Sequence, residues 1–100
     1  MPKIYEYFGL TFFFYSNEHI PIHVHVQYGE YENKVEFVYE NGKLINILFK
    51  KKRGVEQLPA AKQKEVSTFI NHFHNQIVDK WTEFFILKKQ IKNEKISKKL

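Results

Sequence analysis

The chain of 100 residues contains no cysteine, which excludes disulfide bonds, thiolate metal sites and cysteine nucleophiles. The absence of cysteine also fits a reducing compartment, and we expect a cytoplasmic protein. No apolar run approaches the roughly 20 residues that a membrane-spanning helix needs. The first residues, Met1 to Glu6, lack the basic and then apolar pattern of a secretion signal. We therefore expect no membrane among the partners.

The length and composition predict a single domain over residues 1–100. Hydrophobic residues make up 43% of the chain and aromatic residues 17%, which is typical of a globular protein. A chain of this length buries roughly two-thirds of its unfolded surface. One core is therefore sufficient without covalent cross-links.

The net charge of +5 is unevenly distributed. Residues 1–49 carry three Lys/Arg and six Asp/Glu, whereas residues 50–100 carry thirteen and five. A basic half favours an anionic partner such as nucleic acid. The alternative is a solvated, lysine-rich surface without a specific ligand.

The first half of the chain, about residues 3–50, predicts β-strands. Five segments have the expected composition of aromatic and β-branched residues: residues 3–8, 10–16, 23–28, 32–39 and 43–49. Gly9 separates the first two segments, which predicts a tight hairpin.

The last two predicted strands flank the dipeptide Asn41-Gly42. Both residues tolerate positive φ, so the dipeptide is a strong hairpin signal. In the strand that follows, Ile45, Ile47 and Phe49 alternate and are expected to share one face.

A long amphipathic helix is predicted over about residues 60–90. Pro59 fits its start, where a missing N–H has no cost. Apolar residues then recur at intervals of three and four: Val66, Phe69, Ile70, Phe73, Ile77, Trp81 and Phe84. The basic tail, residues 91–100, is expected to form either a short edge strand or a frayed end. The predicted fold class is α+β, an antiparallel sheet of about five strands with this helix packed on one face.

The histidine segment from His19 to Val26 is the most suggestive chemical feature. His23 and His25 are two residues apart in a strand, so both point to the same face with α-carbons about 6.5–7 Å apart. Val24 is expected to point into the core. His19 lies in the preceding loop, so all three histidines can converge on one point.

Three hypotheses explain this segment. In the first, His19, His23 and His25 bind a divalent metal such as zinc and leave one position open to water. In the second, two of the histidines act as general acid and base on a phosphodiester, with Lys51 and Arg53 near the phosphate. In the third, the histidines are structural and pack beside aromatic residues.

Four consecutive cations, Lys50, Lys51, Lys52 and Arg53, follow the last predicted strand. If they meet the C-terminal lysines in space, they form a basic stripe that binds nucleic acid with a steep salt dependence. The glutamates of the first half form no recognisable carboxylate pair and are expected on the solvent side of the sheet: Glu6, Glu18, Glu30, Glu32, Glu36 and Glu40.

Several blocks of the sequence are distinctive: Met1-Pro-Lys-Ile, Gly9-Leu10, Phe12-Phe-Phe-Tyr-Ser-Asn-Glu-His19, Pro21-Ile-His23-Val-His25-Val26, Leu58-Pro59, Trp81 and Lys95-Ile-Ser-Lys-Lys-Leu100. In these blocks the chain resembles the bacterial domain-of-unknown-function family 4160. One departure is Ile22, where many members have a second proline. All three histidines are nevertheless present.

The resemblance implies a small bacterial cytoplasmic protein whose gene often lies beside a small partner gene of the toxin–antitoxin kind. It implies no established reaction. We expect a component of such a module that binds protein or nucleic acid through a face containing His19, His23 and His25. The alternative is a histidine- or metal-dependent (ribo)nuclease that uses the same residues. A homodimer is also compatible with the sequence.

Overall fold

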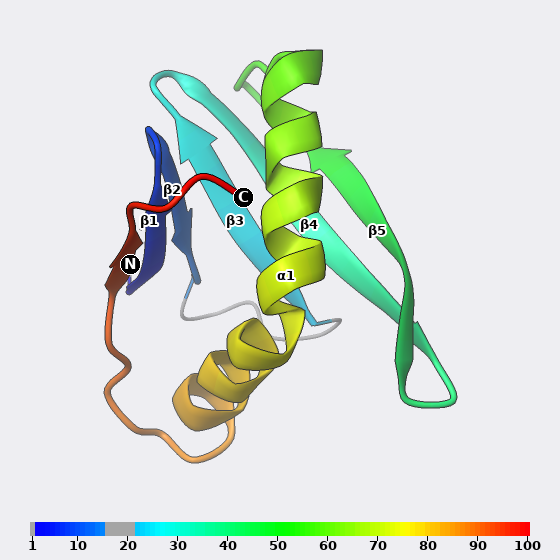
Figure 1. Cartoon of the computed structure of the whole chain (residues 1–100), viewed down its shortest axis with the longest axis vertical. Helices are drawn as coiled ribbons and strands as arrows, with labels where there is room; N and C mark the ends of the chain where they lie inside the picture. Colours follow the sequence, from blue (N-terminus) through cyan, green and yellow to red (C-terminus); the bar gives the residue numbers. More distant parts are fainter. Residues whose placement is uncertain (1, 16–21) are drawn as a thin grey trace.

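The computed structural model of the chain describes residues 2–15 and 22–100, which form one sheet and one helix (Figure 1). The elements are β1 (Lys3–Tyr7), β2 (Leu10–Phe13), β3 (His23–Tyr28), β4 (Tyr31–Glu40), β5 (Lys43–Lys51), α1 (Ala60–Phe85) and β6 (Glu94–Ile96). The strand order is β5-β4-β3-β2-β1-β6. Neighbouring strands are antiparallel, except that β1 and β6 are parallel. The α+β prediction is confirmed, with a sixth strand added.

Both hairpin predictions are confirmed at the level of the backbone. Between β1 and β2, Phe8 and Gly9 have φ of 44° and 85°. Between β4 and β5, Asn41 and Gly42 have φ of 53° and 80°, the two positive values that a tight two-residue turn requires. A Cβ at Gly9 would also lie 3.0 Å from Cε1 of Tyr28. Glycine is therefore favoured at Gly9 by both conformation and space.

The ladder between β4 and β5 contains a bulge. Val38 lies opposite Asn46, but Tyr39 lies opposite Leu44. Ile45 is thus an extra residue, and it is 55% exposed. The β5 residues that pack against the core are Leu44, Ile47 and Phe49. The prediction that Ile45 shares their face is wrong, because a bulge interrupts the alternation of side chains along a strand.

Helix α1 begins after Pro59 and ends at Phe85, before the predicted end near residue 90. It lies across one face of the sheet, in front of β3 and β4 (Figure 1). The centre of the contact is Phe69, whose ring centroid lies 4.4 Å from that of Phe12 and 5.1 Å from that of Tyr7. The predicted stripe thus covers the sheet, although Phe73 and Phe84 are only partly buried.

The C-terminal tail forms the edge strand β6 beside β1. A buried lysine of the helix holds it there: Nζ of Lys80 lies 2.6 Å from the carbonyl oxygen of Lys92 and 2.8 Å from the Glu94 carboxylate. At the end of the chain, the N–H of Leu100 donates to the Tyr7 hydroxyl. Of the two forms expected for the tail, the structure shows the edge strand.

No helix within residues 2–15 and 22–100 is long and apolar enough to cross a membrane. No helix or strand of these residues covers the sheet face opposite α1, which we call the open face (Figure 1). The candidate site lies on that face.

Candidate functional site

The alternation of β3 places His23 and His25 on the open face. Val24 and Val26 point the other way and are fully buried in the core under α1. The two imidazole rings lie beside each other, with centroids 5.2 Å apart. The prediction that both histidines share one face is therefore confirmed. Both are nevertheless buried, with only 2% and 3% of their surface exposed.

Aromatic side chains from the neighbouring strand contribute to the burial of His25. Phe13 lies directly opposite it in the β2–β3 ladder, and its ring stacks at 5.6 Å between centroids. Tyr15, just after β2, places its ring edge-on to the imidazole at 4.3 Å. The packing matches the structural hypothesis, in which the histidines lie beside aromatic residues.

Tyr15 crosses over His25 because its hydroxyl reaches an acid on β4. The Tyr15 hydroxyl donates to Oε2 of Glu32 at 3.2 Å. The same oxygen lies 3.6 Å from Nδ1 of His25 and 3.1 Å from Nζ of Lys52. Lys52 also donates to the Tyr15 hydroxyl. One carboxylate oxygen thus lies close to three polar groups.

We call Tyr15, His25, Glu32 and Lys52 the cross-strand cluster. Its members come from just after β2, from β3, from β4 and from just after β5. The strand register brings these side chains together. Glu32 lies opposite Gln27 on β3. The residue that follows Glu32 on β4 lies opposite the last residue of β5, which directly precedes Lys52. The cluster therefore ties four consecutive strands together on the open face.

The electrostatics of the cluster favour the charged form of its lysine. The hydrogen bond to Tyr15, followed by the contact with Glu32, raises the pKa of Lys52 above its ordinary value. Glu32 is only 6% exposed, and a buried carboxylate requires a partner of this kind. The ammonium of Lys52 is thus engaged within the protein.

This pairing changes how the predicted basic cluster is interpreted. Lys50, Lys51 and Arg53 are exposed, whereas Lys52 is half-buried against Glu32. The C-terminal lysines are near the opposite edge of the sheet, with Lys95 in β6 itself. Five strand spacings of about 4.8 Å put β5 and β6 roughly 24 Å apart. The exposed cations at β5 and the lysine of β6 are therefore separated by the width of the sheet.

The metal prediction depends partly on His19, which lies outside the described residues. Within residues 2–15 and 22–100, no group of three or more His, Asp or Glu side chains is placed to hold a metal ion. His23 and His25 are adjacent, so they supply two neighbouring imidazoles.

Glu32 is the functional candidate that sequence reasoning missed. The sequence predicts it on the solvent side of the sheet with the other glutamates. It does lie on the face opposite α1, but the expectation that it is exposed is wrong, because Tyr15 and Lys52 cover it. The sequence signal that could have located Glu32 is Gly29, which forms the tight turn between β3 and β4. Once that turn is placed, Glu32 lies opposite Gln27, two residues after His25.

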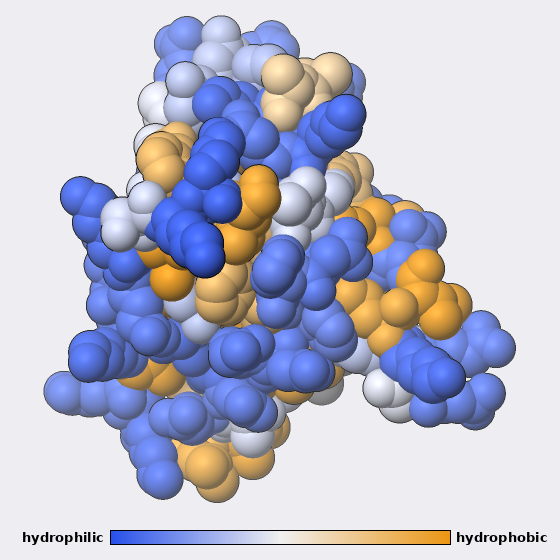
Figure 2. Space-filling view, in the orientation of Figure 1, coloured by the Kyte–Doolittle hydropathy of each residue, from blue (hydrophilic) through white to orange (hydrophobic). Residues whose placement is uncertain are grey.

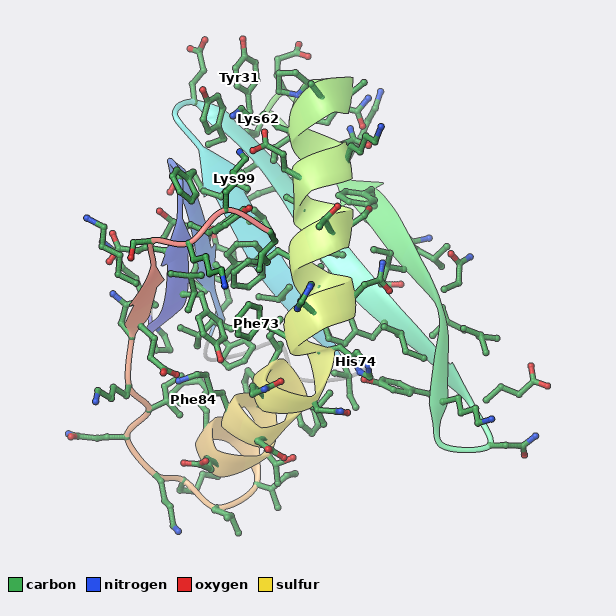
Figure 3. All side chains as sticks on the ribbon, viewed as in Figure 1. Tyr31, Lys62, Phe73, His74, Phe84 and Lys99 are labelled. Atoms are coloured by element: carbon green, nitrogen blue, oxygen red, sulfur yellow. The ribbon has the colours of Figure 1, made fainter. Side chains whose placement is uncertain are left out.

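The histidine of α1 nearest the sheet belongs to the other side of the molecule. His74 lies beside the helix, on the face that carries α1 (Figure 3). Its Nδ1 lies 3.5 Å from the Tyr39 hydroxyl. Because the sheet separates this face from the open face, His74 does not join the cross-strand cluster.

The comparison with family models identifies the class of this chain. Residues 9–82 match the family described as Domain of unknown function (DUF4160). The chain therefore belongs to that family, and the resemblance seen in the sequence is confirmed over the matched residues. Strands β1 and β6 lie outside them. No curated protein and no solved structure matches the chain significantly.

Proposed function

We propose that this protein is a component of a two-protein module of the toxin–antitoxin type, and that it binds a small partner protein through the open face. The observation that carries the proposal is the cross-strand cluster. Its polar groups contact one another across four strands. A face fixed in advance in this way loses little conformational entropy when a partner binds.

One exposed apolar side chain on the open face, Leu48, supplies contact area. Leu48 lies opposite Glu36 in the β4–β5 ladder and is 37% exposed. The neighbouring ion pair, Lys34 with Glu36, has its charged atoms 3.5 Å apart. An apolar side chain next to charged groups is compatible with the mixed composition of protein interfaces.

A histidine-dependent ribonuclease is the second candidate. The observation that favours it is the 3.6 Å approach of the Glu32 carboxylate to Nδ1 of His25, since a carboxylate in that position orients a catalytic imidazole. The burial of both rings favours the binding function instead, because a general acid or base must reach its substrate. The exposed cations Lys50, Lys51 and Arg53 would suit the phosphates of an RNA substrate of that enzyme.

The test is a titration of the purified protein with the small protein encoded by the adjacent gene. We expect binding that Leu48→Arg weakens at least tenfold. The matched control is Leu87→Arg, an exposed leucine just after α1, which should change affinity less than twofold. Absence of binding, or an equal loss in both variants, would overturn the proposal.

A parallel assay on RNA tests the second candidate. Cleavage by the wild type that is lost in His25→Gln, but kept in the exposed-residue control His72→Gln, would favour the ribonuclease. Thermal melting of both variants establishes that each is folded. No cleavage by the wild type removes this candidate.

A further inference from the structure

We infer that the outer edge of β5 pairs with an extended, acidic segment of the partner protein, which adds to the sheet as a seventh strand. The inference rests on the proposed partner-binding function and names the chemistry of the partner and the edge that receives it. Three independent features of β5 support it: its length as an edge strand, a hollow beside it, and its charge.

The first feature is the backbone. Strand β5 runs over nine residues, Lys43–Lys51, and among the described residues it pairs with β4 alone. The opposite edge strand, β6, has only three residues. A long edge strand offers a row of N–H and C=O groups to an added strand. One N–H of β5 is already engaged, because Ile47 donates at 2.9 Å to Oδ1 of its neighbour Asn46, so an added strand has to displace that side-chain contact to use it.

The second feature is a hollow of about 160 Å³ where this edge meets the helix. It is lined by Leu44, Ile45, Asn46, Ile47 and Asn71. The bulge exposes Ile45 at this point, and hydrophobic side chains gather over β5 among hydrophilic ones (Figure 2). In strand addition the backbone supplies affinity and such pockets supply specificity. The hollow is large enough for one side chain of the added strand, and Asn46 and Asn71 add polar groups to its lining.

The third feature is charge. Lys43 stands at one end of β5, and Lys50 and Lys51 at the other, with no acidic residue between them. These three lysines form no ion pair with any residue in the described part of the chain. An added strand with carboxylates at both ends would place opposite charges across the new ladder, which stabilises a strand pair.

The same charges argue against a second copy of this chain as the occupant. In an antiparallel pair of two β5 strands centred on Ile47, Lys43 of each copy faces Lys51 of the other. Like charges directly opposite are destabilising. Edge lysines also block uncontrolled strand pairing, so an acidic strand is the occupant that this edge accepts.

The test uses a synthetic peptide as long as β5, with glutamates at both ends and leucine and valine at its centre. We expect saturable binding, measured by fluorescence anisotropy, that weakens as salt rises. Hydrogen exchange should slow at the amides of β5 when the peptide is added. A peptide with lysines in place of the glutamates, and one with prolines at alternate central positions, should each bind at least tenfold more weakly.

Matched charge reversals locate the site. Lys50→Glu/Lys51→Glu should weaken the acidic peptide at least tenfold, whereas Lys88→Glu/Lys89→Glu, the same change in charge beyond the end of α1, should have less than a twofold effect. Equal binding of the proline peptide would mean a surface for anions in general, and it would overturn strand addition. Absence of binding at millimolar peptide would mean that the lysines only protect the edge.

The protein from the adjacent gene separates this inference from the proposed function. If it binds and is weakened by Leu48→Arg but not by Lys50→Glu/Lys51→Glu, the open face is the interface and the inference fails alone. If the acidic peptide binds β5 and that protein does not bind at all, the proposed module fails and the acidic-strand site remains. If Leu48→Arg and Lys50→Glu/Lys51→Glu both weaken the binding of that protein, and neither control does, the result supports the proposed function and the inference together.

Discussion

The Glu32 carboxylate lies 3.1 Å from Nζ of Lys52, and this contact joins β4 to the end of β5 on the face that the helix does not cover. Its acid is buried, whereas the lysine side chain keeps 38% of its surface exposed. The pair is therefore partly screened by solvent, but the acid still depends on its neighbours.

Replacement of this acid should destabilise the protein. Glu32→Gln removes the charge that faces Lys52 and weakens the acceptor of the Tyr15 hydroxyl, and we expect a loss of about 2 kcal/mol in the free energy of unfolding. The control is Glu36→Gln, whose ion pair with Lys34 is more exposed and should cost less than about 1 kcal/mol. Urea denaturation measures both, and equal losses would show that the cluster adds nothing special.

Alkaline pH should destabilise the fold through Tyr5. Burial, followed by the nearby charges of Glu94 and Asp79, raises the pKa of Tyr5 from 10.0 to about 12. Between these values the folded chain keeps a proton that the unfolded chain has lost, so stability falls as the pH rises from 10 to 12. The linked loss is on the order of 2 kcal/mol.

The measurement is urea denaturation across that pH range for the wild type and Tyr5→Phe. The variant should lose less stability, because its ring carries no titrating hydroxyl. A remaining decline is expected from Lys52 and Lys62, whose raised pKa values stabilise the fold only while they are protonated. Identical declines in the two proteins would contradict the role of Tyr5.

Lys80 should hold the C-terminal strand in place. Lys80→Met keeps most of the apolar stem but loses the contacts with the Lys92 carbonyl and Glu94. We expect hydrogen exchange at residues 94–96 to accelerate at least tenfold, while the centre of α1 stays protected. Lys64→Met, at an exposed position of the same helix, is the control, and a similar acceleration there would remove the proposed role of Lys80.

The core should be sensitive to Phe69, the fully buried ring at the centre of the helix–sheet contact. Phe69→Ala should cost about 3–5 kcal/mol, because it removes buried area and leaves a cavity. Ile86→Ala, at a side chain that is 58% exposed, should change stability by less than about 0.5 kcal/mol. Thermal or urea unfolding compares them, and a loss below about 1 kcal/mol for Phe69→Ala would place the main core contact elsewhere.

Local sequence determined the features that depend on short-range chemistry. Asn41-Gly42 makes a turn with positive φ at both positions, and few other dipeptides tolerate that conformation. The spacing of Val66, Phe69 and Ile70 gave the buried face of α1, because a helix repeats every 3.6 residues. The two-residue period of a strand likewise put His23 and His25 together on one face.

Only the tertiary structure decided what that histidine face became. The bulge at Ile45 comes from how β4 and β5 align, which local propensity does not encode. The burial of Glu32 requires Tyr15 and Lys52 to come together from segments that are far apart in the chain. The alternation of side chains along a strand was enough to predict that His23 and His25 lie on the same face of the sheet. The contacts of His25 with residues of other strands depend on strand register, because packing rather than spacing along the chain determines contacts between distant segments.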